Sequence, residues 1–291
     1  MKWKTGIYII YISLCLLIGT LCLFTGLSLL KQDEPSASPP SLPWSSAKEG
    51  ALHRTSVLTE SMETSYTYDE DDMALLQTYR EYNSDVVGLI TIEDTVLNHP
   101  IVQTPEDEDY YLYKDLDQKY NSHGVPFLSA ASQIEGRKGI RVLYGHNIHK
   151  NTRDVFADLA GYRDLDYYQT HPIIKTVSES GTRNWLIFAY FIVDNADEAP
   201  FRYSDVTEFL SKTEFQTYFT EVQKRNWLNV PIEFTIEDTF LLLSSCSNEL
   251  SGSGTNRMVV IAKELSVQES YEEAVTSSTM KEDPLLPERL R

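Results

Sequence analysis

Residues 239–265 decide the fold, and they read TFLLLSSC (239–246), SNELSGSGTN (247–256) and RMVVIAKEL (257–265). The first part is a continuous apolar strand that ends at Cys246. The second is a loop rich in glycine and serine, and the third is a strand that begins at Arg257. Two consecutive strands joined in this way are predicted to be antiparallel neighbours. Cys246 and Arg257 should therefore share one edge of a sheet.

The sequence before this hairpin is also predicted to form mostly strands. Turn-forming residues separate segments that are rich in β-branched and aromatic side chains. Including the two strands above, the predicted segments are 86–92, 96–103, 139–145, 171–178, 184–193, 231–236, 239–246 and 257–265. This order argues against alternating βαβ units. A closed or nearly closed barrel would leave few free strand edges, so we expect a mostly β, α+β fold.

Two segments are predicted to be helical. The first follows the acidic residues 69–72, which suit the positive end of a helix, and it has one apolar face. The second spans residues 205–226, where apolar side chains recur at helical spacing, and Asp205 with Glu208 predicts a capping box at its start. The apolar face of the first helix consists of Met73, Leu75, Leu76, Tyr79 and Tyr82.

The amino end carries an uncharged apolar run at residues 6–30, GIYIIYISLCLLIGTLCLFTGLSLL. A helix of this length can cross the ~30 Å hydrocarbon core of a bilayer. Lys2 and Lys4 precede the run and Asp33 follows it, so the positive-inside rule predicts a cytoplasmic end (1–5) and an extracellular domain. A cleaved signal peptide is the alternative, but the run is too long and lacks a small-residue cleavage site. We expect a single-pass anchor in the cell membrane.

The remaining chain divides by composition. Prolines and serines without apolar periodicity predict a linker at residues 31–68. The strand-rich segment with its leading helix predicts a catalytic domain at residues 69–265. After it the chain turns polar, and residues 266–291 are predicted to be a tail.

Cys246 is the only cysteine of the predicted extracellular domain, because Cys15 and Cys22 lie in the anchor. A single exported thiol is an unpaired surface group, a site of intermolecular pairing or a reactive group. The predicted neighbour Arg257 would favour the reactive thiolate, and its fork of N–H donors can hold a developing oxyanion. Alternatively, Arg257 serves only to protect a strand edge.

The proton carrier would be a histidine, and His146 is the first candidate. It follows a predicted strand directly after Gly145, which allows a sharp exit from the strand. The second candidate is His149, three residues further along. The other histidines are interpreted as structural or, for the first, as part of the linker: His53, His99, His123 and His171.

Charge argues against two classes of ligand. The chain carries 25 Lys and Arg against 43 Asp and Glu, a net charge of −18, which would repel nucleic acid. The acidic clusters at residues 69–72 and 106–109 offer oxygen ligands but lack the spacing of an EF-hand loop. We expect no nucleic-acid partner, no metal and no cofactor.

Three motifs together resemble the sortases, and class B sortases in particular. They are Tyr-Gly-His-Asn (144–147) after a strand, Leu-Ser-Ser-Cys (243–246) at the end of another, and Asn-Arg-Met-Val-Val-Ile-Ala-Lys (256–263) at the start of the last. The resemblance covers roughly residues 86–265, including DYYLYKDLDQKY (109–120) and the long helix before the cysteine strand. It implies a closed eight-stranded sortase barrel.

The resemblance also implies a catalytic triad of Cys246, His146 and Arg257. By this resemblance, the protein cleaves a C-terminal sorting signal of exported proteins through a thioester on Cys246. It then transfers the acyl group to an amine of a cell-wall precursor or a pilin lysine. Ser129, Ser245 and Asn248 depart from the residue types common in the family, which leaves the sorting motif open.

Two alternative functions remain open at this point. A hydrolytic cysteine peptidase would use the same three residues with water as the acceptor. A membrane-tethered binding module with an inactive site would not depend on Cys246 at all. The identity of the amine acceptor is open as well.

Overall fold

The computed structural model describes residues 66–136, 138–148, 154–197, 200–246 and 255–290. The helices are α2 (Glu70–Tyr82), α3 (Leu165–Thr170), α4 (Lys212–Arg225) and α5 (Glu272–Thr276), with the 3-10 helices η1 (Ala157–Arg163) and η2 (Glu288–Leu290). The strands are β1 (Tyr66–Thr67), β2 (Val86–Thr91), β3 (Asn98–Val102), β4 (Phe127–Leu128), β5 (Gly139–Tyr144), β6 (Asn147–Ile148), β7 (Asp154–Val155), β8 (Ile173–Ser178), β9 (Gly181–Asp194), β10 (Leu228–Asn229), β11 (Thr239–Cys246), β12 (Asn256–Glu264) and β13 (Thr279–Met280).

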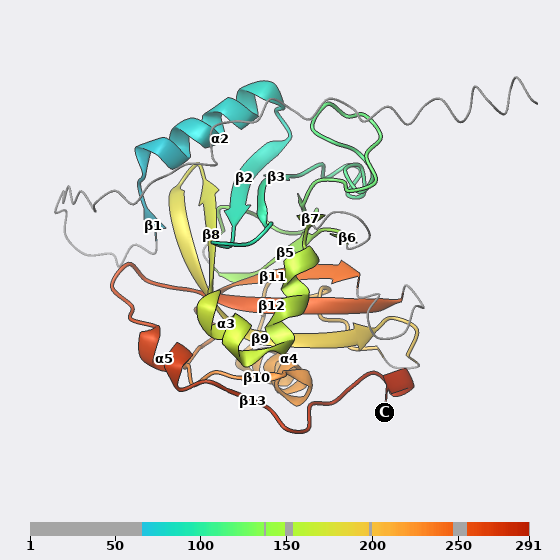
Figure 1. Ribbon diagram of the computed structural model, residues 1–291, viewed down its shortest axis with the longest axis vertical. Helices are drawn as coiled ribbons and strands as arrows, with labels where there is room; N and C mark the ends of the chain where they lie inside the picture. Colours follow the sequence, from blue (N-terminus) through green and yellow to red (C-terminus); the bar gives the residue numbers. More distant parts are fainter. Residues whose placement is uncertain (1–65, 137, 149–153, 198–199, 247–254, 291) are drawn as a thin grey trace, which may run out of the picture. The chain divides into compact units, whose positions relative to one another are not determined.

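The strands form a closed barrel (Figure 1). The main sheet has the order β1-β9-β12-β11-β5-β4-β3-β2-β8, and β8 also pairs with β9. The eight strands from β9 to β8 therefore close on themselves, with β1 added outside at β9. The pairs β5–β11 and β3–β4 are parallel, and the other pairs of the barrel are antiparallel. The predicted α+β fold with an eight-stranded barrel is confirmed.

Apolar side chains on both faces of the strands explain why their sequences read as continuous apolar runs. One cluster receives side chains from all eight barrel strands, among them Leu143 and Leu243, and fills the barrel. A second lies on the outer face of β5, β9, β11 and β12, where Phe215 and Phe219 of α4 cover it. A third packs Leu76 of α2 against β2, β3, β4 and β8.

The helix α2 begins where the acidic cluster predicts. The Asp69 carboxylate caps it by accepting hydrogen bonds from the backbone N–H groups of Asp71 and Asp72. The buried face of α2 differs in detail from the predicted one. It includes Asp72, whose carboxylate lies 2.7 Å from Nζ of Lys175 in β8, whereas Tyr82 is 55% exposed.

The second predicted helix is shorter than residues 205–226. The helix α4 begins at Lys212, and its cap is Ser211, whose Oγ accepts a hydrogen bond from the Glu214 N–H at 3.1 Å. The predicted capping box at Asp205 is therefore wrong by two turns. The cause is a backbone hydrogen bond of 2.8 Å from Ile140 N to Thr207 O, which holds the preceding segment in a non-helical conformation beside β5.

Residues 231–236 do not form the predicted strand. Ile232, Phe234 and Ile236 alternate because they pack into the second hydrophobic cluster, which lies between the outer face of the sheet and α4 and is called the α4 cluster below. The segment forms no ladder of strand hydrogen bonds. The eighth barrel strand is instead β4, which has two residues and is too short to show a period of its own.

The segment 266–290 folds against the domain, unlike the tail that its polar composition predicts. β13 pairs with β10, Lys281 N donates to Trp227 O at 2.7 Å, and Leu285 N donates to Lys224 O at 2.8 Å. These hydrogen bonds use backbone groups, which side-chain composition does not reveal, and Val275 of the same segment is buried in the barrel cluster.

The predicted linker (31–68) and anchor (6–30) lie almost entirely outside the described residues. Across the described ranges, the structure contains no helix with the length and apolar character needed to cross a bilayer.

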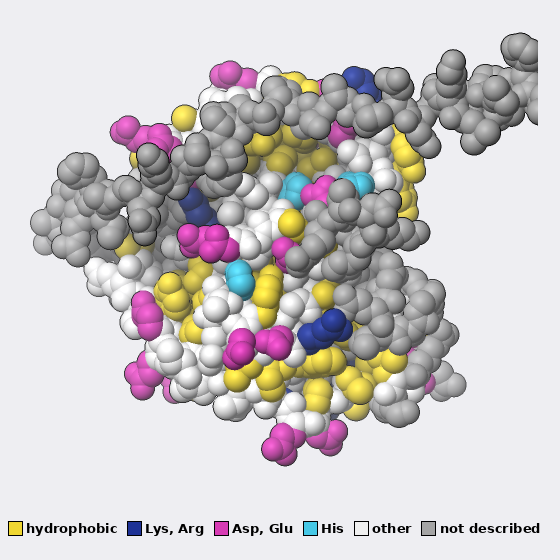
Figure 2. Space-filling view, viewed as in Figure 1, with side chains coloured by type: hydrophobic (Ala, Val, Ile, Leu, Met, Phe, Trp, Pro, Cys, Tyr) yellow, Lys and Arg dark blue, Asp and Glu magenta, His cyan; other side chains and the backbone are white. Residues whose placement is uncertain are grey.

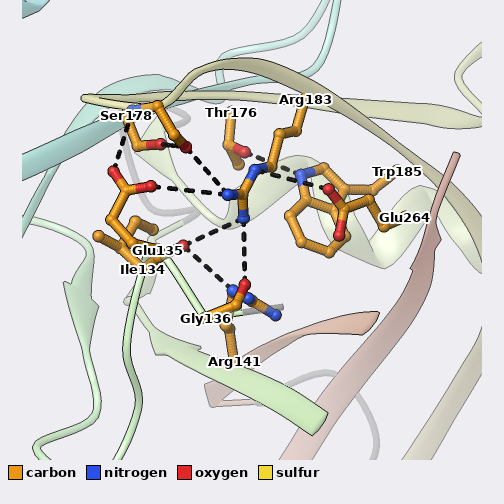
Figure 3. A network of polar contacts seen from close by, with 10 residues as sticks. Ile134, Glu135, Gly136, Arg141, Thr176, Ser178, Arg183, Trp185 and Glu264 are labelled. Carbon is orange, nitrogen blue, oxygen red and sulfur yellow. Dashed lines mark hydrogen bonds and ion pairs between the residues drawn. The ribbon is translucent and has the colours of Figure 1, made fainter. Parts of the chain in front are cut away.

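A network of polar contacts surrounds two buried arginines, Arg141 of β5 and Arg183 of β9 (Figure 3). The Arg183 guanidinium lies 3.5 Å from both Glu135 and Glu264. Arg141 donates from Nε to Ile134 O at 3.2 Å, and its guanidinium stands over the Trp185 ring. Burial and the charge of Arg183 lower the pKa of Arg141 to about 10. These charges lie at the end of β5 that is opposite to His146, so we assign them a structural role.

Candidate functional site

Strand register brings the three predicted site residues to one edge of the barrel. Cys246 and Arg257 are direct partners across the antiparallel pair β11–β12. In the parallel strands β5 and β11, the last paired residues are Tyr144 and Ser244. His146 comes two residues after Tyr144, and Cys246 comes two residues after Ser244. The backbone positions of Cys246, His146 and Arg257 are therefore neighbours although they are up to 111 residues apart in the sequence.

Hydrogen bonds fix the ends of β5 and β11 relative to each other. Gly145 N donates to Ser244 O at 3.2 Å, and the Ser245 hydroxyl donates to Gly145 O at 2.7 Å. The hydroxyls of Ser244 and Tyr203 are also 2.8 Å apart. Because Ser244 and Ser245 are both buried, these contacts hold the residues that lead into Cys246 and His146 at a fixed spacing.

Gly145 is required for a reason that differs from the predicted sharp exit. Its φ does not lie in the left-handed region, where Gly124, Gly139 and Gly181 are found. A Cβ at position 145 would instead meet the Phe156 ring at 2.8 and 2.9 Å. Gly145 is therefore needed because the ring of Phe156 packs directly against the backbone before His146.

His146 is held at both its ring and its backbone. Nε2 lies 2.8 Å from Leu112 O, and since a carbonyl only accepts, this nitrogen carries a proton. The Tyr113 ring packs beside the imidazole at 5.2 Å between centroids. On the other side, Phe156 N donates to His146 O at 2.8 Å. With Nε2 fixed as a donor, Nδ1 is the nitrogen that can take up and release a proton.

Burial lowers the pKa of His146 below the ordinary histidine value. The hydrogen bond to Leu112 O opposes this effect, and the nearby His123 adds to it when charged. The neutral imidazole is therefore favoured near neutral pH, with its lone pair on Nδ1.

Arg257 is the second residue of β12 and lies between Cys246 on β11 and Val193 on β9. Its side chain is partly buried, and Nη1 donates to the Asn256 carbonyl at 3.0 Å. A guanidinium keeps its charge at any ordinary pH and presents planar N–H donors. Its position beside the cysteine strand suits it to stabilise negative charge there.

The other histidines lie in three settings. His149, the second candidate, falls outside the described residues. His171 caps the end of α3 and stacks on Tyr167 at 4.3 Å between ring centroids. His99 and His123 lie 3.1 and 2.7 Å from the two carboxylate oxygens of Asp154. This cluster was not predicted from the sequence, because its members are 24 to 55 residues apart and belong to no motif.

The acidic clusters have structural partners. Beyond the roles of Asp69 and Asp72 in α2, Glu108 accepts hydrogen bonds from Ala130 N at 2.5 Å and from the Ser129 hydroxyl at 3.3 Å. Within the parts of the chain that the structure describes, no group of three histidine, cysteine or acidic side chains is arranged to hold a metal ion. Acidic side chains are spread over the visible face of the molecule, as the net charge leads one to expect (Figure 2).

Two curated proteins are similar to this chain in sequence, while no family model matches it. Sortase B of Staphylococcus aureus (strain NCTC 8325) is 27% identical over 191 residues, which cover 66% of this chain and 75% of the relative. Sortase B of Listeria monocytogenes is 29% identical over 188 residues, which cover 65% of this chain and 73% of the relative.

Solved structures are similar in fold. A Staphylococcus aureus sortase B–substrate complex is 26% identical with a TM-score of 0.59, over 67% of this chain and 86% of that one. A crystal structure of Staphylococcus aureus sortase B is 25% identical with a TM-score of 0.58, over 68% of this chain and 95% of that one. Sequence and fold thus point to the same set of relatives.

Proposed function

This chain belongs to the class B sortases, a family of cysteine transpeptidases, and we propose that Cys246, His146 and Arg257 are its catalytic triad. Its substrate would be a sorting signal near the carboxyl end of an exported protein. One of the solved structures with a similar fold is a complex of sortase B with its substrate, which supports a substrate-binding site in this chain. The acceptor would be an amine, from a cell-wall precursor or from a pilin lysine.

The observation that carries this proposal is the register at the barrel edge. It pairs Cys246 with Arg257 across β11–β12, and it places Tyr144 beside Ser244 across β5–β11, two residues before His146 and Cys246. A nucleophile, a proton carrier and an oxyanion donor must all reach one reacting carbonyl, and neighbouring strand ends meet that requirement. No cofactor is needed, because these three side chains supply each chemical role.

In the first half of the reaction, the Cys246 thiolate attacks the scissile carbonyl carbon and forms a C–S bond. Arg257 stabilises the oxyanion of the tetrahedral intermediate. The intermediate collapses as the C–N bond breaks, and the imidazolium of His146 gives its Nδ1 proton to the leaving amine. The product is a thioester on Cys246 and a neutral His146 that still donates from Nε2 to Leu112 O.

In the second half, the acceptor amine attacks the thioester carbonyl, and His146 Nδ1 takes its proton. The C–S bond then breaks, which restores the Cys246 thiolate and the imidazolium and leaves an amide between the two substrates. Atoms and charges balance over the cycle, and no oxidant or metal takes part.

The protonation states limit the active fraction of the protein. The reaction needs thiolate and imidazolium together, yet burial lowers the pKa of His146. With ordinary values of about 8.5 for a thiol and about 6.5 for an imidazole, this pair makes up about 1% of molecules at most pH values between them. A lower His146 pKa decreases the fraction further, so a charge that favours the thiolate, such as Arg257, has a direct effect on rate.

We further propose that residues 6–30 anchor the protein in the cell membrane and that a linker leads from them to an extracellular catalytic domain, which extends from β1 to the segment 266–290. The length of the apolar run and the flanking charges support this topology. Tethering would hold the enzyme beside substrates that are themselves at the outer face of the membrane, which raises their effective concentration.

An amine-capture assay tests transfer against hydrolysis. The full-length chain in detergent is incubated with a library of five-residue sorting motifs, with and without triglycine or hydroxylamine, and the products are identified by mass spectrometry. Transfer predicts peptide joined to the amine, in proportion to amine concentration. Free acid alone at every amine concentration would favour the hydrolytic peptidase, and unchanged biological function of Cys246→Ala would favour a binding module.

A further inference from the structure

The Asp154 carboxylate contacts histidine side chains from two other parts of the chain and the N–H of the next residue. One carboxylate oxygen lies 2.7 Å from Nδ1 of His123, in the turn before β4. The other lies 3.1 Å from Nε2 of His99 on β3, and it also accepts the backbone N–H of Val155 at 2.8 Å. Since a carboxylate only accepts, His123 presents Nδ1–H to it, and the contact is strongest while His123 is an imidazolium.

Val155, directly after Asp154, has a strained backbone. Its φ is +53°, in the left-handed region that β-branched residues rarely adopt. Such a conformation is energetically unfavourable and persists only where the surroundings impose it. Here the Asp154 carboxylate holds the Val155 N–H, and the Val155 side chain is fully buried beside Gly145.

The segments that contact the backbone and the ring of His146 are both connected to the cluster of His99, His123 and Asp154. On the backbone side, Phe156 N donates to His146 O, and Phe156 follows Val155 directly. On the ring side, Tyr113 packs against the imidazole, and Tyr113 O accepts a hydrogen bond of 2.9 Å from Asn121 N in the turn that carries His123. The contact between His123 and Asp154 therefore joins the segment that binds the His146 backbone to the segment that packs against its ring.

We propose that His123 and Asp154, with His99 as a second partner of the carboxylate, form a brace that positions His146 by tying these two segments together. Neither side chain takes part in the chemistry; both are positioning residues. The inference rests on the proposed role of His146 as the proton carrier.

The brace also places a charge near the reacting imidazole. An imidazolium at His123 disfavours a second imidazolium at His146. The close contacts of His99 and His123 with Asp154 outweigh the burial of that carboxyl group and hold its pKa well below its usual range. Asp154 therefore stays ionised, and stays in contact with both histidines, over the pH range in which the enzyme is active. Tyr113, whose ring packs against the His146 imidazole, lies in the same loop as His123.

The first test measures steady-state kinetics of the full-length chain with the sorting peptide chosen by the library screen. Asp154→Asn keeps the shape of the side chain but removes its charge, and we expect kcat to fall about 10-fold with KM changed less than about 2-fold, because displacement of a catalytic group by ~1 Å can cost up to ~10²-fold. Asp166→Asn, an exposed aspartate on α3, is the matched control and should retain full activity.

The second test does not depend on activity or on the kinetic variants. In full-length Cys246→Ala with ¹³C-labelled histidine, NMR follows the titration of His146 before and after His123→Gln. The substitution removes a positive charge, so the midpoint of the His146 titration should rise, whereas His171→Gln should leave it unchanged. Thermal melts of each variant confirm that the protein is folded at the temperature used.

An unchanged His146 titration in His123→Gln, together with an unchanged kcat in folded Asp154→Asn, would overturn the brace. If Cys246→Ala proved active, the proposed function would fail instead. The NMR titration would then still decide whether the brace acts on His146.

Discussion

Adding one methyl group at Gly145 should disturb the proposed catalytic histidine without touching it. In Gly145→Ala the new Cβ would lie 2.8 Å from Cδ2 and 2.9 Å from Cε2 of Phe156, and 3.0 Å from Cγ1 of Val155. Ordinary contacts of this kind begin near 3.4 Å, so the ring must retreat by about 0.6 Å. Phe156 is fully buried in the barrel cluster and has no free space to enter.

Two measurable costs follow from this clash. Overpacking a well-filled interior typically lowers the free energy of unfolding by about 1–3 kcal/mol. In addition, Phe156 N donates a hydrogen bond to His146 O, so a displacement of Phe156 should also displace His146. A shift of about half an ångström should lower kcat by about 10-fold, since a 1 Å displacement can cost ~10²-fold.

The assay compares Gly145→Ala with Gly136→Ala by urea denaturation and by peptide transfer. Gly136 precedes β5 at the other end of the strand, and a Cβ there meets only the end of the Arg141 side chain at 3.1 Å and a carbonyl at 3.4 Å. This control should keep its kcat. The double variant Gly145→Ala/Phe156→Leu, which removes part of the ring, should recover part of the lost activity. Wild-type stability and kcat in Gly145→Ala would refute the reasoning.

Four further predictions follow from the same edge of the barrel. Ser245→Ala removes the buried hydroxyl that donates to Gly145 O and should lower the free energy of unfolding by about 1 kcal/mol in urea titrations, whereas Ser245→Thr, which keeps the hydroxyl, should lower it less. Arg257→Lys should reduce kcat by at least about 10-fold, because a point charge does not replace a planar fork at an oxyanion, and a wild-type rate would show that Arg257 only protects a strand edge. His146→Ala should lower the rate by at least ~10² while His149→Ala costs little. Because burial lowers the pKa of His146, the rising limb of kcat/KM against pH should have its midpoint below 6.5, and a midpoint above that value would contradict the assignment.

The hairpin of β11 and β12 could be predicted because its information is local. A long apolar run, a loop rich in glycine and serine, and a second apolar run define two neighbouring strands, and the register then places Cys246 opposite Arg257. The position of His146 could be predicted for the same reason, since this residue closely follows a segment whose composition is typical of a strand. Local pattern therefore sufficed for the strand ends that carry the proposed triad.

Features that depend on distant contacts were not predictable. Residues 231–236 alternate like a strand because they pack over the α4 cluster, and nothing in their own sequence distinguishes the two cases. The start of α4 was misplaced because a backbone bond from Ile140, on another element, holds Thr207 out of the helix. The role of Asp154 depends on His99 and His123, which lie 55 and 31 residues away, and on a backbone strain at Val155 that a sequence does not display.

The most direct test of the proposed triad is to trap the acyl-enzyme. The full-length chain is mixed with its sorting peptide in the absence of any amine, quenched in acid, digested and mapped by mass spectrometry. The proposed mechanism predicts an acyl adduct on the peptide that contains Cys246. Hydroxylamine should remove this adduct, and both the adduct and all turnover should be absent in Cys246→Ala. Turnover by Cys246→Ala, or an adduct on any other residue, would contradict the account.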